Sequence, residues 1–291
     1  MKIPLCPLCN SRNNEKRFSV NGYNVLVCHV CELLFINPFP TDSDQVHHKI
    51  SEYNYDELEI VNAEKHYFAE VQYYKKYFSL INEECKEKTS ILDVGCGTGH
   101  LLERLKIYPD LFRTGIELNT KRAEIARKVS NCEINQVPIE KFSSKRKFDV
   151  ITMINVLSHI PSFNNLFKSL RWLLKKKGKL ILKVCEMRSD VKKQNVFDWG
   201  IPDHLHFLGL KSLEFICQKY NFKIIRYYSI PYSKELFSIY RWREPGRSNF
   251  RNIIKKFIIC IPFSLLFLSK CYDIICGNKI YSSFIVLSPK S

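Results

Sequence analysis

The stretch that decides the fold is "TSILDVGCGTGHLLERL", residues 89–105. The short apolar run from Ile91 to Val94 is typical of a buried strand, and it leads directly into three glycines at positions 95, 97 and 99. Leucines then recur with helical spacing from position 101. A strand, a glycine-rich turn and a helix in this order bring the backbone close to a ligand and present the unpaired N–H groups of a helix start.

A second apolar segment, "RTGIELN" at 113–119, supports a ligand site at this turn. It predicts a strand that ends in Glu117, 20 residues beyond Gly97. A carboxylate at the tip of the neighbouring strand is placed to accept hydrogen bonds from ribose hydroxyls. An NAD-type dinucleotide fold is the alternative, but the spacing G-x-G-x-G, in place of G-x-G-x-x-G, works against it.

Strand and helix patterns alternate along the rest of the chain. Further strands are expected at 132–137, 148–154, 179–185, 223–230 and 280–288, and helices at 119–129, 163–177 and 209–222. The helix that begins at Phe163 is expected to run to a stop at Gly178. Alternation of this kind predicts an α/β fold, a seven-stranded, mostly parallel sheet with helices on both faces.

The motifs "ILDVGCGTG" (91–99), "GIELN" (115–119) and "FDVITMINVLSHI" (148–160) resemble those of class I S-adenosylmethionine-dependent methyltransferases. The resemblance covers about residues 65–230 and the last strand. It implies a Rossmann-like sheet whose seventh strand is antiparallel. The N-terminal cysteines and "NPFP" resemble methyltransferases found with sugar-nucleotide, lipopolysaccharide and natural-product pathways.

The resemblance also assigns roles to residues. Asp93 would orient the methionine amino group, Glu117 would bind both ribose hydroxyls, and Leu118 would pack on the adenine. Asn155 would face the methionine portion, and His159 belongs to the same turn. The bed under the cofactor would be formed by Gly95, Cys96, Gly97 and Gly99. Val137, Pro138 and Ile139 are three candidates to line the adenine pocket.

Four cysteines near the N-terminus have the spacing of a metal site. Cys6, Cys9, Cys28 and Cys31 fit C-x2-C-x18-C-x2-C, the pattern of a zinc ribbon with a hairpin turn at Gly22. A redox pair would need one Cys-x-x-Cys near a β-α-β unit, not two pairs that flank a hairpin. Because all four ligands come from protein, a structural rather than a catalytic Zn²⁺ is expected.

Charge and composition limit the partners and the compartment. The net charge of +16 favours anionic partners, which include nucleic acid, acidic lipid headgroups and phosphorylated substrates. "MKIPLCPLC" lacks the apolar core of a secretory signal, so we expect the cytoplasm, where disulfides are rare.

The loop "PDHLHFLGLKSL" (202–213) holds two candidate catalytic residues, His204 and His206. It lies after the fifth strand, at the edge of the sheet where ligands bind. Histidine titrates near neutral pH and could remove a proton from the acceptor. Alternation along an extended segment predicts that only one of the two reaches the site. Packing or helix capping by both histidines is the alternative.

The domain organisation follows from these patterns. We expect a zinc-ribbon-like module at 1–40, a helical lid or linker at 41–88 and the methyltransferase domain at 89–291. Tyr53 and Tyr55 could close over the cofactor; packing of an aromatic helix on the sheet is the alternative. The methyltransferase domain carries an insert at 231–278 in which a basic stretch precedes the apolar run "FIICIPFSLLFL" (257–268).

The insert has two interpretations. Twelve apolar residues are too few to cross a bilayer. A basic stretch beside them suits the membrane interface, so 241–268 could associate with the inner face of the membrane and form a wall for a lipid-linked acceptor. A helix pair that closes a soluble pocket or forms a dimer contact is the alternative.

Three functions remain open from the sequence. The first is methyl transfer to a small molecule, a sugar or a lipid-linked glycan. The second is methylation of an RNA base, but residues 1–36 hold only four Lys or Arg beside two Glu, which disfavours RNA binding by the module. The third is a non-catalytic binding protein that keeps the fold.

Overall fold

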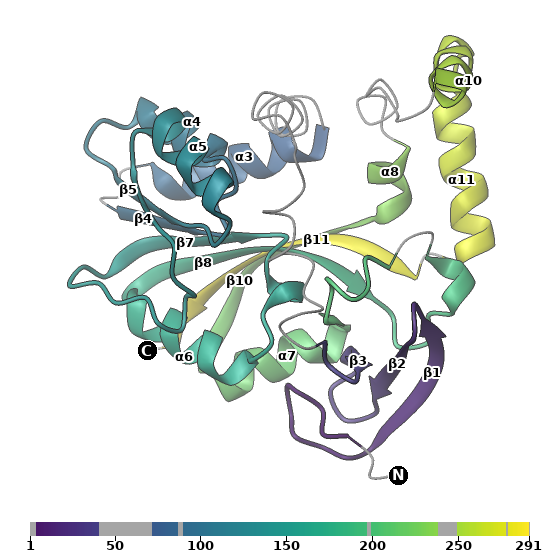
Figure 1. Cartoon of the computed structure of the whole chain (residues 1–291), viewed down its shortest axis with the longest axis horizontal. Helices are drawn as coiled ribbons and strands as arrows, with labels where there is room; N and C mark the ends of the chain where they lie inside the picture. Colours follow the sequence, from purple (N-terminus) through teal and green to yellow (C-terminus); the bar gives the residue numbers. More distant parts are fainter. Residues whose placement is uncertain are drawn as a thin grey trace.

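A seven-stranded sheet forms the centre of the protein (Figure 1). The computed structural model describes residues 4–40, 72–86, 90–196, 199–237, 249–277 and 279–290. Across the sheet the strands lie in the order β10 (Phe222–Pro231), β11 (Ile280–Pro289), β8 (Leu174–Met187), β7 (Phe148–Ile154), β4 (Ser90–Val94), β5 (Phe112–Ile116), β6 (Glu133–Asn135). β11 is antiparallel to both of its neighbours, and the other strand pairs are parallel. The expected α/β class with a mostly parallel sheet is confirmed.

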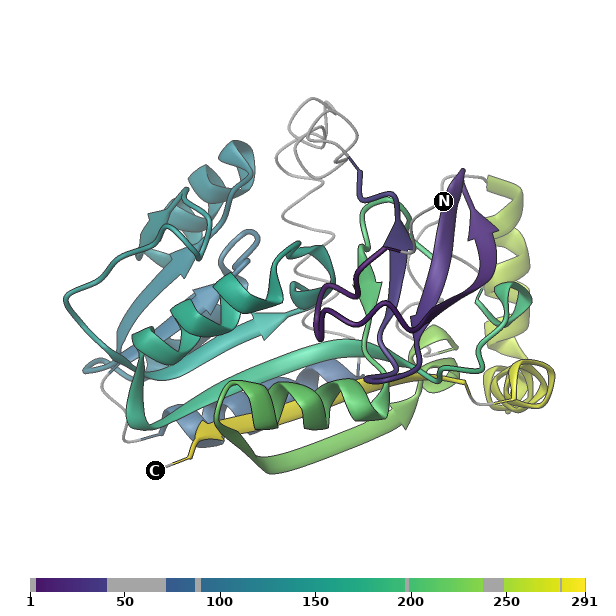
Figure 2. The same cartoon turned by 90° about the horizontal axis from the view of Figure 1, so that it is seen from below.

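Helices cover both faces of this sheet (Figures 1 and 2). On one face lie α6 (Phe163–Leu173) and α7 (Leu210–Lys219). On the other lie α3 (Gln72–Cys85), α4 (His100–Arg104) and α5 (Thr120–Ser130). Successive residues of one strand serve opposite faces, since Leu92 packs with the α6 side and Ile91 with the α3 side. The central strands therefore bury successive residues rather than alternate ones, as in β4, where all five residues are buried.

The helix expected at 163–177 is shorter than the sequence predicts. α6 ends at Leu173, and β8 begins at Leu174, so the lysine run at 175–177 is extended rather than helical. A Cβ on Gly178 would lie 2.9 Å from Leu174 Cδ2 and 3.1 Å from the Phe148 carbonyl oxygen. Gly178 therefore permits a close approach between β8 and β7 and is not the end of a helix. The expected buried residues Phe163, Leu166, Leu170 and Leu173 are confirmed.

The N-terminal module forms a second, four-stranded antiparallel sheet. Its strands are β1 (Asn14–Val20), β2 (Tyr23–Cys28), β3 (Leu34–Asn37) and β9 (His206–Phe207). β9 comes from the loop that follows β8, and it pairs with β3 through Leu34–Phe207 and Phe35–His206. The module is thus joined by backbone hydrogen bonds to the loop that carries both candidate histidines.

The Tyr-rich helix α3 packs on the sheet. The Tyr77 ring stacks on Phe284 of β11 at 5.0 Å, and its hydroxyl lies 3.1 Å from Ser282 Oγ. This contact agrees with an aromatic helix that covers the sheet. The predicted lid residues Tyr53 and Tyr55 lie outside the described residues, so their role stays a prediction.

Among the described residues, three helices lie between β10 and β11: α8 (Tyr232–Leu236), α10 (Asn249–Cys260) and α11 (Ser264–Cys276). Within the described part of the chain, no single helix has the length and apolar content to cross a bilayer. Ile253–Cys260 and Ser264–Ile275 meet those two criteria only when taken together, and the pair is bent by 103°.

Candidate functional site

The glycine-rich turn between β4 and α4 is built on left-handed backbone. Gly95, Gly97 and Gly99 have φ of 69°, 55° and 81°. A Cβ on Gly95 would lie 2.4 Å from Val156 Cγ2, and a Cβ on Gly99 would lie 3.0 Å from the backbone of Ala126. No larger residue fits at these two positions. The turn consequently approaches the end of β7 on one side and α5 on the other.

Glu117 lies directly against this turn. One carboxylate oxygen accepts a hydrogen bond from the Gly97 N–H at 2.9 Å, and the other accepts one from the Asn119 N–H at 2.9 Å. The side chain is only half-buried. Because each carboxylate oxygen can accept more than one hydrogen bond, the group can also accept from a diol above the turn. The expected neighbourhood of Glu117 and the glycines is present.

Asp93 is the buried acid of the site. It is 3% exposed, and Thr152 Oγ1 donates to its Oδ1 at 2.6 Å. Burial raises the pKa of Asp93 to about 7, the Thr152 hydrogen bond opposes this shift, and the charge of Glu117 adds to it. A buried carboxyl group of this kind gains most from a bound cation, such as the ammonium of an amino acid.

The candidate residues around the adenine differ in exposure. Leu118 is 46% exposed and Val137 is 38% exposed, while Ile139 lies in the core. Ile139 is therefore excluded from the adenine surface, and Val137 and Pro138 remain. The Cys96 side chain also turns inward, since a Cβ on Gly115 would lie 2.7 Å from Cys96 Sγ. Only the backbone of Cys96 can therefore contact a cofactor bound over the turn.

A cavity of about 250 Å³ lies beyond the end of β7. Asn155, with φ of 58°, lies on its wall and precedes the Val156 that Gly95 contacts. The full lining consists of Asn155, Leu157, Ser158, Lys183, Val184, Cys185, Met187, Val196, His204, His206, Phe207, Leu208, Tyr232 and Ile280. The cavity thus includes Asn155, the residue expected to face the methionine portion of a cofactor.

Lys183 is a cavity residue that the sequence pattern hides. It stands in the middle of "KLILKVC", is 4% exposed and pairs with Ile154 and Phe284 across the sheet. The sequence did offer a signal for a special role of this residue. Lysine is seldom fully buried, yet Lys183 stands in an otherwise apolar strand that was expected to be covered on both faces. Lys183 is therefore a polar residue in the lining of the cavity.

Both histidines border the cavity, whereas strand alternation predicted that only one would. Alternation fails because His204 lies in a turn and β9 begins only at His206. His204 Nδ1 lies 3.2 Å from the Trp199 carbonyl oxygen, which makes Nδ1 the donor and Nε2 the unprotonated nitrogen of the neutral ring. The His204 ring also lies 4.8 Å from that of His159.

His206 is more constrained. Its Nε2 donates to the Ile160 carbonyl oxygen at 2.8 Å, its ring packs on Phe163 at 4.3 Å, and it is 1% exposed. Burial lowers the pKa of His206 to about 4, so the ring is neutral near pH 7. This makes His206 a poor base and a good packing residue. The geometry favours His204 for proton removal.

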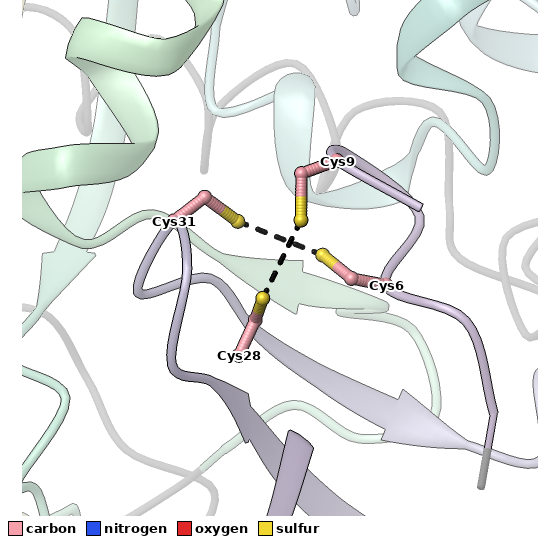
Figure 3. A group of neighbouring side chains, drawn as sticks. All are labelled: Cys6, Cys9, Cys28 and Cys31. Atoms are coloured by element: carbon pink, nitrogen blue, oxygen red, sulfur yellow. Dashed lines mark hydrogen bonds between the residues drawn. The ribbon is translucent and has the colours of Figure 1, made fainter. Parts of the chain in front are cut away.

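The four N-terminal cysteines converge on one point (Figure 3). The sulfurs of Cys6 and Cys31 are 3.6 Å apart, those of Cys9 and Cys28 are 3.5 Å apart, and all four lie within 4.8 Å of one another. Tetrahedral coordination with Zn–S distances of about 2.3 Å requires sulfurs roughly 3.8 Å apart. The donor set therefore fits Zn²⁺ in number, chemistry and spacing.

Backbone geometry and electrostatics agree with this fit. In each knuckle the fourth residue after the first cysteine donates to that cysteine's carbonyl oxygen, Asn10 to Cys6 at 2.9 Å and Glu32 to Cys28 at 2.8 Å. The Cys31 thiol lowers the pKa of Cys6 to about 6, and burial raises the pKa of Cys9 to about 11. Four thiolates at this spacing need a cation between them.

The cysteine module holds the histidine loop in place. Ile36 donates its N–H to the Leu205 carbonyl oxygen at 3.0 Å, beside the β3–β9 pairing. Ser212 Oγ at the start of α7 donates to the Cys31 carbonyl oxygen at 2.7 Å. A Cβ on Gly209 would lie 2.6 Å from the Glu32 carbonyl oxygen. The knuckle of Cys28 and Cys31 thus lies directly against the segment that closes one side of the cavity.

The fold and the turn define an α/β protein that binds a nucleoside-type ligand at the carboxyl edge of its sheet. A family profile described as "Methyltransferase domain" matches residues 64–227, more than half of the chain. The chain belongs to this methyltransferase family.

Curated relatives match a shorter region. The ubiquinone biosynthesis O-methyltransferase of Histophilus somni (strain 2336) is 35% identical over 101 residues, which are 31% of this chain and 42% of that protein. The one of Actinobacillus pleuropneumoniae serotype 5b (strain L20) is 36% identical over 101 residues, 31% of this chain and 43% of that protein. The chain thus spans less than half the length of these relatives.

Solved structures share the fold. The O-methyltransferase of a trans-AT PKS multienzyme of Brevibacillus brevis, in complex with S-adenosyl-L-homocysteine, has a TM-score of 0.55 at 16% identity and covers 87% of this chain and 81% of its own. The cyclopropane synthase MmaA2 of Mycobacterium tuberculosis has a TM-score of 0.53 at 16% identity, covering 74% of this chain and 83% of its own. At these identities the likeness concerns the fold alone.

Proposed function

We propose that the protein transfers the methyl group of S-adenosylmethionine to a small-molecule, sugar or lipid-linked acceptor. The observation that carries the proposal is the contact of Glu117 with the glycine turn, which directly follows the buried Asp93. A cavity with histidines on its wall includes Asn155, whose neighbour Val156 lies against Gly95 of the same turn. The family match and the relatives named as ubiquinone O-methyltransferases support it. RNA methylation has less support, because residues 1–36 hold only four Lys or Arg beside two Glu.

The residues would divide the work of binding. S-adenosylmethionine supplies a methyl group on a positively charged sulfur, already activated for displacement. Glu117 would accept hydrogen bonds from the ribose hydroxyls, and Asp93 would pair with the ammonium. Asn155 borders both the turn and the cavity, where it would separate the methionine portion from the acceptor. Alignment of the acceptor by the cavity wall would provide much of the rate enhancement.

A hydroxyl acceptor would need a proton acceptor and a charge partner. His204 Nε2 would take the proton, because Nδ1 is committed to the Trp199 carbonyl oxygen. The Lys183 ammonium on the same wall would stabilise the oxyanion that forms. His206 would hold the loop rather than move a proton, given its burial and the lowered pKa.

We also propose that the four cysteines bind one structural Zn²⁺ and that the protein acts in the cytoplasm. The fit of the four sulfurs supports the metal. No disulfide joins the cysteines in the described part of the chain, which suits a reducing compartment.

The test is a labelling experiment. Purified protein is incubated with methyl-labelled S-adenosylmethionine and fractionated cell extract, with and without ribonuclease. Label in a low-mass or lipid fraction that survives ribonuclease supports the proposal, and label in RNA contradicts it. Glu117→Ala serves as the matched inactive protein, because it alters the ribose contact outside the acceptor cavity.

The same assay tests which of the two histidines removes the proton. His204→Ala should lower kcat for a hydroxyl acceptor by about 10²-fold or more, in keeping with loss of a general base. His206→Asn, which leaves a polar side chain at the buried position, should change kcat much less. Equal losses in both variants would contradict the assignment of the base to His204.

A further inference from the structure

Exposed apolar side chains concentrate on α10, α11 and the turn between them. Phe257 is 70% exposed, Phe267 is 67% exposed, and Ile274 is 81% exposed. Their exposed apolar neighbours are Ile253, Ile254, Ile261, Phe263, Leu266 and Ile275. Single exposed apolar residues are common on soluble proteins, but a continuous set on two consecutive helices marks an interaction surface.

The two faces of α11 are clearly different. Phe263, Phe267 and Ile274 are spaced at intervals of four and seven residues, so they lie on one outer face. The opposite face packs on the body of the protein. Ser269 is buried, Tyr272 Oη donates to the Asn195 carbonyl oxygen at 3.1 Å, and the Tyr272 ring lies 5.8 Å from Phe237. α11 is therefore anchored on its inner side, while its outer side is exposed and mostly apolar.

Positive charge adjoins this apolar surface in the sequence. From 241 to 277 the sequence has seven Lys or Arg and two acidic residues, and six of the seven basic residues lie at 241–256. Lys270 is exposed on the outer face of α11, between Phe267 and Ile274. Aromatic and aliphatic residues flanked by cations match an anionic bilayer surface, where the cations meet headgroups and the apolar side chains enter the acyl boundary.

The bend of the helix pair favours a position on the bilayer surface over one that crosses the bilayer. α10 and α11 are bent by 103° at the break between them, and each is too short to cross a bilayer alone. Two short helices at this angle can both rest their apolar sides at an interface. A second copy of the chain is a poorer occupant, because it would bring the same excess of positive charge to the contact.

We infer that the outer faces of α10 and α11 dock the protein on the surface of a membrane rich in anionic lipid. Figure 1 shows the pair on the opposite side of the molecule from α4 and α5, with α10 beyond the end of α11. The docked surface therefore leaves the side of the sheet covered by α4 and α5 unobstructed.

The docked helices are connected to the acceptor cavity. Phe237, which follows α8, contacts Tyr272 of α11, and Tyr232 at the start of α8 lines the cavity. If the proposed methyl transfer is correct, this path places the acceptor cavity close to the lipid surface and fits an apolar or lipid-linked acceptor. Docking itself does not depend on methyl transfer.

The experiment measures co-sedimentation of the full chain with phosphatidylcholine vesicles that contain or lack phosphatidylglycerol. We expect binding to the anionic vesicles, with weaker binding at high salt and to neutral vesicles. The variant Phe257→Ser/Phe267→Ser/Ile274→Ser should lower vesicle affinity by about tenfold or more, given the apolar area lost from the interface. Lys270→Gln should lower it about fivefold.

A matched control comes from exposed apolar residues far from the insert. The variant Ile107→Ser/Trp172→Ser/Leu210→Ser changes side chains that are 61%, 53% and 54% exposed and should leave vesicle binding unchanged. Calorimetry with S-adenosylmethionine on each variant separates this inference from the proposed function, because loss of docking should leave cofactor affinity intact.

Two results would overturn the inference. One is unchanged vesicle binding by the α10–α11 variant. The other is a dimer in sedimentation equilibrium that the same variant converts to monomer while the unaltered protein ignores anionic vesicles. In that case the surface would be an interface between two copies.

Discussion

Acidification from pH 7 to pH 5 should weaken S-adenosylmethionine binding about 50-fold, because Asp93 must lose a proton to pair with the ammonium. Burial raises the pKa of this carboxyl to about 7 in the ligand-free protein, with a further contribution from the nearby charge of Glu117. A bound ammonium would return the pKa to about 4, its value when ionisation is unopposed.

The magnitude follows from this difference. At pH 5 only about one Asp93 in a hundred is ionised without ligand, while most are ionised with it. The lost affinity corresponds to about 2.3 kcal/mol, with 1.36 kcal/mol for each pKa unit. The range stops at pH 7 because the α-amino group of the ligand begins to titrate above it.

The assay is isothermal titration calorimetry at pH 5, 6 and 7 in buffers of different ionisation enthalpy. Proton release on binding should be close to one at pH 5, since the free protein then holds the Asp93 proton. Asp93→Asn keeps an oxygen that can accept from Thr152 Oγ1, so it is the matched variant. It should bind weakly with little pH dependence in this range.

Thermal stability is an independent test of the raised pKa of Asp93. A carboxyl whose folded pKa is raised stabilises the fold fully below its unfolded value, near 3.9, and this contribution is lost as pH rises through 7. Ligand-free Asp93→Asn should therefore unfold at a higher temperature than the natural protein at pH 8. Wild-type affinity that does not change with pH, or an equal slope in Asp93→Asn, would refute this account of Asp93.

Three further outcomes are expected. Glu117→Ala should weaken cofactor binding about 10²-fold, through loss of two charge-assisted hydrogen bonds, with a folded circular-dichroism spectrum; unchanged affinity would contradict the ribose assignment. Cys28→Ser should reduce zinc from about one per chain to none and lower the unfolding temperature, whereas Cys132→Ser should do neither. Lys183→Met should reduce kcat for a hydroxyl acceptor at least tenfold with cofactor affinity unchanged, measured by kinetics and calorimetry.

The parts of this protein that could be predicted from sequence are those with a local signal. The left-handed backbone at positions 95, 97 and 99 favours glycine, and Glu117 follows these glycines at a distance set by one helix and one strand. The cysteine spacing and the run of seven strands are likewise visible in the chain. Each of these features depends on the residue types inside one short segment.

The parts that escaped prediction depend on contacts between distant segments. β9 has only two residues, too few for a periodic pattern, and it exists because β3 offers an edge to pair with. The place of Lys183 in the cavity follows from its register against β7 and β11. Gly178 resembled a helix stop, but the fit of Leu174 and Phe148 determines its position.

The pairing of β3 with β9 has a consequence for chimeric proteins. Residues 4–40 resemble a portable cassette in sequence, yet their last strand shares its backbone hydrogen bonds with His206 and Phe207. Grafting that cassette from another homologue would change the partner of the histidine loop along with the four-cysteine group. The unit that can be exchanged consists of residues 4–40 together with the histidine loop. We therefore expect a chimera to acquire the acceptor preference of the donor protein only when both segments are exchanged.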